Sequence, residues 1–257
     1  LFGVIDLADP ASVADLQKFF DRYLKGENNG WEATPHVCYT VLDPGGLDES
    51  NIVAPHWPLT STPAELFLDA NNGSLSATAP ASAGVATYAS TDIGSSSKFS
   101  LVADKDMTIY GALNADLWVS TDTGNDLDVF VAVYKEDTEG NRLHHITLRA
   151  APAQAFVRSL ERDGMLPAAV AYTGPVGRLR ASHRALDSAA STRLEPVHTH
   201  GAEELVAPGE TVELQIDLWP TAMKVHAGER LVIEIAGHPA GPLAMHMPGE
   251  SGLPGGD

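Results

Sequence analysis

The sequence predicts a mainly β protein, an antiparallel β-sandwich preceded by a short α/β segment. Three observations support this prediction. Several segments alternate apolar and polar residues with the period of two that a half-buried strand requires. Turn residues separate these segments, and the one strong helical pattern lies near the start of the chain. With 257 residues and an apolar content of 44%, the chain can bury a sizeable core.

The clearest strand pattern lies in residues 210–237. Within it, residues 212–218 alternate strictly, so this segment is predicted to be a strand with one buried face. Pro220 has no amide hydrogen to donate to a sheet, and the strand is expected to end there. Turn residues follow at 227–229, and residues 231–235 are predicted to form a second strand. We expect the two strands to form a hairpin-like pair that packs against another sheet, because an isolated pair is only marginally stable.

The helical pattern covers residues 11–25. Its apolar residues recur at helical spacing on one face, namely Val13, Leu16, Phe20, Tyr23 and Leu24. Ser12 is the predicted N-cap, and Gly26 is the predicted C-terminal cap. The next strand is predicted at 36–41, where Cys38 is expected to be a small buried side chain. Helix, loop and strand together give the α/β character of the first 45 residues.

The remaining pattern is mostly β. Strands are predicted at 65–69, 107–120, 127–134, 146–149 and 178–186, with a short helical segment at 154–163. Residues 74–100 are expected to be loop with weak strands, and residues 187–209 to be a long polar connection. The Gly- and Pro-rich residues 237–257 are expected to be irregular.

The charge and the cysteine content exclude several classes of protein. The formal net charge is −18, which repels phosphate backbones, so no nucleic-acid partner is expected. A single cysteine, Cys38, allows no internal disulfide and no Cys-based zinc site. No apolar run is long enough for a membrane helix, and the first residues do not resemble a signal peptide. We therefore expect no membrane partner and a cytoplasmic location.

Histidines and aspartates offer candidate metal ligands, but a structural role is favoured for each. His144 and His145 are neighbours on a predicted strand and face opposite ways. His198 and His200 have the spacing nearest to a zinc site, yet they lie in a polar connection. Three carboxylates, Asp122, Asp126 and Asp128, are spaced faintly like a calcium loop, without the later Glu and the flanking helices of an EF-hand. Calcium at these three residues stays an open alternative, and no metal or cofactor site is predicted.

Two further features invite a functional interpretation. Ser182 and His183 are adjacent and suggest a nucleophile and its base, but neighbours on a strand do not meet and no acid orients the histidine, so a structural role is favoured. Trp118 and Trp219 are expected at strand ends, packed in the core or an interface. Exposed tryptophans could instead bind sugars.

Several motifs together resemble the C-terminal part of the X-Pro dipeptidyl-peptidase / cocaine-esterase-like (CocE/NonD) family of serine hydrolases. The first is Phe19-Phe20-Asp21-Arg22-Tyr23-Leu24-Lys25-Gly26, which is similar to the last helix of that family's hydrolase domain. The others follow in order: His56-Trp57-Pro58-Leu59, Leu117-Trp118-Val119-Ser120-Thr121-Asp122, Leu179-Arg180-Ala181-Ser182-His183-Arg184-Ala185-Leu186-Asp187, Leu218-Trp219-Pro220-Thr221-Ala222 and Ala227-Gly228-Glu229-Arg230-Leu231.

The resemblance implies a jelly-roll, galactose-binding-like β-sandwich preceded by the end of an α/β-hydrolase domain. The implied organisation is a hydrolase remnant at 1–45, a linker and first strand at 46–70, and the jelly-roll domain at 71–257, with an irregular tail at 237–257. The implied partner is the α/β-hydrolase catalytic domain of the parent protein, and a homodimer is left open.

The catalytic residues of that family have no counterpart in this chain. Its nucleophile lies in a G-x-S-x-x-G elbow, and its histidine precedes the F-F-D helix. Neither feature is found here, so no catalytic residue is predicted, and the chain alone is expected to be inactive. We expect an accessory C-terminal region of a dipeptidyl-peptidase or acyl esterase/amidase that shapes the cleft of the catalytic domain. A stand-alone carbohydrate- or peptide-binding jelly roll is the alternative, and a scaffold domain a weaker one.

Overall fold

The computed structural model describes residues 10–57, 59, 63–146, 159, 171–172 and 174–239. The chain divides into two compact units. Unit 1 comprises Leu1–Thr60 and His145–Tyr172, and unit 2 comprises Ser61–His144 and Thr173–Asp257. Strands dominate the described residues, which confirms the prediction of a mainly β protein. No helix in these ranges is long and apolar enough to cross a membrane.

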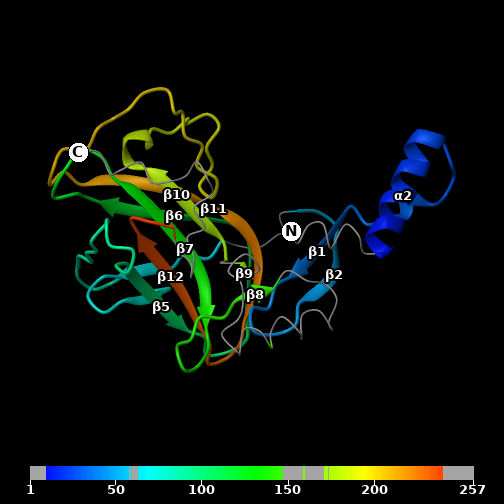
Figure 1. The fold of residues 1–257 in the computed structure, drawn as a ribbon, viewed down its shortest axis with the longest axis horizontal. Helices are drawn as coiled ribbons and strands as arrows, with labels where there is room; N and C mark the ends of the chain where they lie inside the picture. The colour runs from blue at the N-terminus through cyan, green and yellow to red at the C-terminus, as the bar shows by residue number, and fades with distance from the viewer. Residues whose placement is uncertain are drawn as a thin grey trace. The chain divides into compact units, whose positions relative to one another are not determined.

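Unit 1 contains the helical pattern and two small sheets (Figure 1). The elements are α2 at Pro10–Lys25, a 3-10 turn η1 at Trp31–Ala33, and strands β1 at Val37–Val41, β2 at Glu49–Ala54, β8 at His145–Ile146 and β9 at Ala171–Tyr172. β1 pairs antiparallel with β2, and β8 pairs antiparallel with β9. The predicted helix and the predicted strand at 36–41 are confirmed, whereas β2 had no distinct strand pattern.

Helix α2 begins three residues earlier than the cap prediction requires. It starts at Pro10, so Ser12 lies inside the first turn and the N-cap prediction is wrong. Proline is well suited to the first helical position because its φ is already helical and its missing amide hydrogen would have no partner there. The other end agrees with the prediction, since Gly26 takes a left-handed φ of 72° after the last turn.

Cys38 is exposed, and the prediction of a buried thiol is wrong. It lies on β1, whose sheet has only two strands, and no second layer in the described residues covers its side chain. Alternation in a strand indicates which residues share a face. It does not show that another element covers that face.

Unit 2 is built from two sheets. Its elements are β3 at Phe67–Asp69, β4 at Ser74–Ser76, β5 at Ser97–Val102, β6 at Met107–Val119, β7 at Asp128–Glu136, β10 at Val176–Arg180, a 3-10 turn η3 at Ala181–His183, β11 at Val212–Val225 and β12 at Arg230–Ala236. The larger sheet has the order β10-β7-β12-β5-β4-β3, and its central strands lie side by side in Figure 1. The smaller sheet pairs β11 with β6 along almost their whole length.

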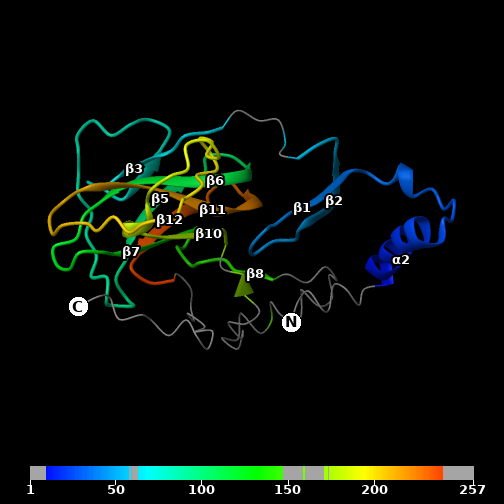
Figure 2. The ribbon, with the colours of Figure 1, turned by 90° about the horizontal axis from the view of Figure 1, so that it is seen from above.

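One hydrophobic core lies between these two sheets. The smaller sheet contributes Leu214 and Ile216, both 0% exposed, and the larger sheet contributes Val129, Val131 and others of the same cluster. Figure 2 shows the β6–β11 pair running alongside the strands of the larger sheet. Two sheets that share one core form a β-sandwich, as the alternating pattern predicted.

The segment at 210–237 differs from its prediction in two ways. β11 continues through Pro220 to Val225, and the register shifts between Leu218 and Thr221. A bulge tolerates proline because the extra residue has no ladder hydrogen bond to lose. The predicted hairpin-like pair is also wrong, because β11 pairs with β6 whereas β12 lies between β7 and β5. The turn at 227–229 therefore connects one sheet to the other.

A buried ion pair holds that turn in place. Lys135 lies on the buried face of β7, in phase with Val131 and Val133, and is 0% exposed. Its Nζ lies 2.8 Å from Oε2 of Glu229. The same oxygen accepts a hydrogen bond of 2.7 Å from the amide of His226. Sequence reasoning missed this pair, although a lysine in phase with Val131 and Val133 indicates that a buried partner is needed.

Candidate functional site

Ser182 connects two loops of the sandwich. Strand β10 ends at Arg180 and the turn η3 follows, so the predicted strand at 178–186 is wrong beyond Arg180. Ser182 is 0% exposed. Its Oγ donates a 2.6 Å hydrogen bond to Oδ2 of Asp126, and its amide donates a 2.9 Å bond to Oδ1. Two hydrogen bonds on one carboxylate fix η3 against the loop that precedes β7.

Arg180 strengthens this junction from the end of β10. It pairs with Asp128 across the β10–β7 ladder, and its Nε and Nη2 donate to the two carboxylate oxygens at 2.9 and 2.8 Å. The hydrogen bond to Asp128 raises the pKa of Arg180, and the charges of Asp128 and Asp126 act in the same direction against a smaller effect of burial. The Arg180 guanidinium therefore keeps its charge in this bidentate contact.

Arg184 closes the junction on its other side. Its Nη1 donates to the carbonyl of Glu204, and its Nη2 lies 3.2 Å from Oε2 of the same residue. The amide of Glu204 donates to the carbonyl of Ser182 at 2.8 Å. We call the set a loop latch, formed by Asp126, Asp128, Arg180, Ser182 and Arg184. Its parts lie up to 58 positions apart in the chain, and sequence reasoning did not pair them.

The geometry of Ser182 and His183 does not support nucleophilic catalysis. The Ser182 hydroxyl is buried and donates to Asp126, whereas an activated nucleophile must be accessible and donate to a base. The Nε2 atom of His183 instead faces Glu203, with 4.0 Å to Oε1. The structural role that the sequence favoured for this pair agrees with these contacts.

The structure does not bring Asp122, Asp126 and Asp128 together as calcium ligands. Asp126 binds Ser182, Asp128 binds Arg180, and Asp122 is exposed to solvent. Over the ranges that the structure describes, no group of three His, Cys, Asp or Glu side chains is arranged to hold a metal ion.

Three histidines gather beside the loop latch. The ring of His200 lies 5.6 Å from that of His183 and 5.9 Å from that of His198, measured between centroids. Nδ1 of His183 and Nε2 of His198 are buried and have no hydrogen-bond partner. Burial lowers the pKa of His198, the charge of His200 lowers it further, and a hydrogen bond to the backbone of Gln215 opposes both. The sequence suggested the His198–His200 pair, but it did not indicate His183 as a neighbour.

His145 lies in unit 1 and contacts a loop of the same unit. It is 3% exposed, and its Nε2 lies 2.8 Å from Oδ2 of Asp48. The other oxygen of Asp48 accepts a 2.8 Å hydrogen bond from the amide of Asp43. This contact orders the 43–48 loop, and it assigns His145 a structural role.

Trp118 and Trp219 are on the surface, so of the two expected places, core or interface, the core is wrong and an interface stays a prediction. Their exposed fractions are 67% and 65%. Trp118 faces Glu213 across the β6–β11 ladder, out of phase with the buried Leu117 and Leu214. Both tryptophans therefore belong to the outer face of the smaller sheet, together with several polar and acidic side chains.

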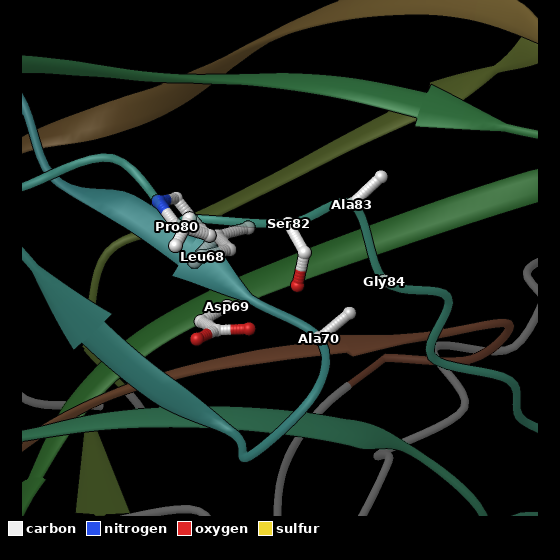
Figure 3. Close-up of a pocket in the computed structure, with 8 residues that line it drawn as sticks. Leu68, Asp69, Ala70, Pro80, Ser82, Ala83 and Gly84 are labelled. Atoms are coloured by element: carbon white, nitrogen blue, oxygen red, sulfur yellow. The ribbon is translucent and has the colours of Figure 1, made fainter.

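A shallow pocket lies beside β3 (Figure 3). Most of the side chains that line it are small, and one of them, Asp69, is charged. Oδ1 of Asp69 accepts hydrogen bonds of 2.9 Å from the amide and from the side chain of Asn71. The carboxylate thus serves the turn after β3, and the pocket presents no convergent set of catalytic groups.

Helix α2 carries an exposed apolar face. Helix α2 has no buried residue. The six apolar side chains of its face are 37–77% exposed, namely Val13, Leu16, Phe19, Phe20, Tyr23 and Leu24. Phe19 contacts Trp31 of the same unit, with 5.2 Å between the ring centroids. A contiguous apolar face of this kind marks a contact surface.

Comparison with solved structures supports one family. A CocE/NonD family hydrolase from Staphylococcus aureus, known in two crystal structures, is 31% and 32% identical to this chain, with TM-scores of 0.76 and 0.75. Each match covers 91% of this chain, which spans 39% of the length of that protein. An α-amino acid ester hydrolase is 16% identical with a TM-score of 0.54, over 86% of this chain and 36% of its own, and shows likeness of fold alone.

Family comparison gives the same result. No curated protein matches the chain significantly by sequence. The family described as the X-Pro dipeptidyl-peptidase C-terminal non-catalytic domain matches residues 29–245. This match covers most of the chain and confirms the resemblance carried by the motifs. The chain therefore belongs to the X-Pro dipeptidyl-peptidase C-terminal, CocE/NonD-like family of non-catalytic domains.

Proposed function

We propose that this chain is the accessory C-terminal region of a serine hydrolase of the dipeptidyl-peptidase or acyl esterase/amidase type. In this proposal, residues 1–45 complete an α/β-hydrolase domain and residues 71–257 form a jelly roll that packs on it and shapes its cleft. The nucleophile, histidine and acid of the parent enzyme lie outside this chain. The chain contributes positioning and closure, and it performs no chemical step.

The exposed apolar face of α2 carries the proposal. A helix of 16 residues is only marginally stable alone in water, and most helical stability comes from packing of the apolar face. Complete burial of one large apolar side chain contributes about 1.5–3 kcal/mol. Six such side chains without cover therefore require a partner of matching apolar character.

The length of the relatives indicates which partner this is. The chain spans 39% of the S. aureus CocE/NonD family hydrolase, so most of that protein has no counterpart here. In our proposal, the corresponding part of the parent protein supplies the catalytic domain and the surface that covers α2. The acidic net charge of −18 makes a second copy of this chain a less favourable occupant.

A serine-directed label tests the catalytic part of the proposal on the full-length parent protein. The protein is treated with a fluorophosphonate, and the modified serine is mapped by mass spectrometry. We expect a single labelled serine outside the residues of this chain. Labelling of Ser182, or of any other serine of this chain, with loss of turnover would overturn the proposal.

A pair of substitutions on α2 tests the docking. Leu16→Asp places a charge on the apolar face, whereas Ala14→Asp places the same charge on the exposed opposite side of the helix. In the full-length protein, Leu16→Asp is expected to lower the unfolding temperature and the hydrolytic rate, and Ala14→Asp to change neither. Equal effects of the two variants would contradict docking through this face. A concentration-dependent dimer that only Leu16→Asp abolishes would assign the face to a second copy.

A second candidate function is a carbohydrate-binding module, and the exposure of Trp118 and Trp219 favours it. Strand spacing places Trp118 and Trp219 roughly 20 Å apart on one face of the smaller sheet. Exposed aromatic rings can stack on sugars while nearby amides and carboxylates form hydrogen bonds. Calorimetry with soluble oligosaccharides distinguishes the two functions. Oligosaccharide binding that Trp118→Ala abolishes would support the carbohydrate-binding module. Absence of binding would contradict the module and favour the accessory role in a hydrolase.

A further inference from the structure

We propose that the cluster of His183, His198 and His200 makes residues 187–204 a proton-sensitive closure, packed on β11 with neutral imidazoles and loosened when the imidazoles take up protons. The closure goes beyond the accessory role proposed above and does not depend on it. It rests on the positions of the three rings and on the contacts that hold this segment to the sandwich.

The three rings are close enough to affect one another. His200 stands between the other two, with centroid distances of 5.6 Å and 5.9 Å. Its backbone has a φ of 49°, in the left-handed region that few residues other than glycine adopt. Two protonated imidazoles at this separation repel each other, because their charges lie well within the screening length of physiological salt.

His198 has no place for an added proton. Its Nε2 is buried and has no acceptor, and its ring interacts with the backbone of Gln215 on β11. A charged N–H at Nε2 would be buried without a partner, which is costly. The segment must open for this nitrogen to reach water.

His183 differs from His198 because a carboxylate stands near it. Its Nε2 faces Oε1 of Glu203 at 4.0 Å, so its protonated form gains an ion pair. Its Nδ1 is nevertheless buried without a partner. The charged groups on the packed elements are Arg180 and Arg184 around η3, Asp187, Arg193, Glu195, Glu203 and Glu204 on the segment itself, and Glu213 and Asp217 on β11.

The direction of the pH effect follows from His198. Burial and the neighbouring His200 lower the pKa of His198 below the ordinary histidine value of 6.5. The closed segment therefore binds fewer protons than the open one. Closure is fully favoured above about pH 6.5 and weakens as the pH falls below that value.

Contacts of the segment show what such loosening releases. The amide of Asp187 donates a 2.7 Å hydrogen bond to the carbonyl of Val197, and the amide of Thr199 donates a 2.9 Å hydrogen bond to the carbonyl of Ala185. The amide of Glu204 joins the segment to Ser182 of the loop latch. Opening of 187–204 therefore breaks these bonds, whereas Asp126 and Asp128 keep their bonds to Ser182 and Arg180.

Hydrogen exchange on the full-length protein tests the closure. Exchange of peptides covering 187–204 is measured between pH 7.5 and 5, corrected for the intrinsic rate and compared with β7 peptides. We expect opening to increase below pH 6.5, by up to about tenfold per pH unit for uptake of one proton. His198→Gln should remove this increase, and the exposed His200→Gln should make it smaller, because the loss of the His200 charge brings the pKa of His198 in the closed segment nearer to its ordinary value.

Each outcome decides the proposal. An increase confined to 187–204 in the wild type and absent in His198→Gln supports the closure. No increase in the wild type overturns it, and an undiminished increase in His198→Gln assigns the opening to another group and also overturns it. If His198→Gln does not fold, His200→Gln decides in the same way, since that ring is on the surface: a smaller increase supports the closure and an undiminished one overturns it. Labelling of the catalytic serine is independent of every one of these results.

Discussion

Replacement of Ser182 by alanine should loosen the loop latch without creating a cavity of any size. The substitution removes only the Oγ atom, which donates a 2.6 Å hydrogen bond to Oδ2 of the Asp126 carboxylate. The amide of Ser182 still donates to Oδ1, and Nε of Arg180 remains 3.9 Å from Oδ2. The Asp126 carboxylate therefore loses one hydrogen bond and keeps its other two contacts.

The expected cost follows from the kind of bond. A hydrogen bond to a charged group contributes about 1.5–3 kcal/mol, and the remaining partners of Asp126 place the loss near the middle of that range, at about 2 kcal/mol. Since about 1.4 kcal/mol is a factor of ten, the population of the open junction should increase roughly 30-fold.

Hydrogen exchange of the full-length protein measures this population. Peptides covering 121–128 and 181–186 should exchange roughly 30-fold faster in Ser182→Ala than in the wild type. Ser188→Ala is the matched control, because Ser188 is exposed in the same connection, and surface changes stay within about 0.5 kcal/mol. If Ser182→Ala accelerates exchange no more than the control, the buried hydroxyl does not stabilise the junction and the latch is refuted.

Three further predictions concern the sandwich. Glu229→Gln removes the carboxylate charge that lies 2.8 Å from Nζ of Lys135 and should lower the free energy of unfolding in urea by about 1.5–3 kcal/mol, whereas a loss below about 1 kcal/mol would show that the pair is dispensable. Burial alone would raise the pKa of Glu234, but hydrogen bonds from Ser96 and Tyr134 with the charges of Lys98 and Arg142 lower it overall. Stability from Glu234 is therefore present above pH 4.5 and lost as the pH falls through the lower folded value, and Glu234→Gln should lack that part of the acid sensitivity in a pH series of urea titrations. Leu214→Ala should cost about 2–5 kcal/mol and Trp118→Ala less than about 1 kcal/mol by the same titration, and the reverse order would mean that the β6–β11 faces are inverted.

Alternation in the sequence predicted which residues of unit 2 are buried. The apolar phase of 212–218 and of 127–134 matches the core positions of β11 and β7, because a period of two reflects the side-chain geometry of one strand. The same rule places Trp118 on the outer face, opposite in phase to Leu117. We expected Trp118 in the core or an interface because of the apolar residues near it in the strand, but those residues lie on the opposite face.

Strand partners and the loop latch could not be predicted in this way. β12 pairs with β7 and β5, which are distant in sequence, and alternation in one strand contains no information about its neighbours. Ser182 and Asp126 meet over a separation of 56 residues. The helical spacing of α2 predicted an apolar face correctly, but only the structure shows that the described residues leave this face uncovered.

Protection of α2 in the full-length protein tests the central claim most directly. The claim is that the catalytic domain covers the apolar face of this helix, which the present chain leaves exposed. Hydrogen exchange of peptides covering Pro10–Lys25 should then be slow, and protection should approach that of β7 in the sandwich core. Exchange close to that of an isolated 16-residue helix would show that nothing covers the face, and would contradict an accessory role through α2.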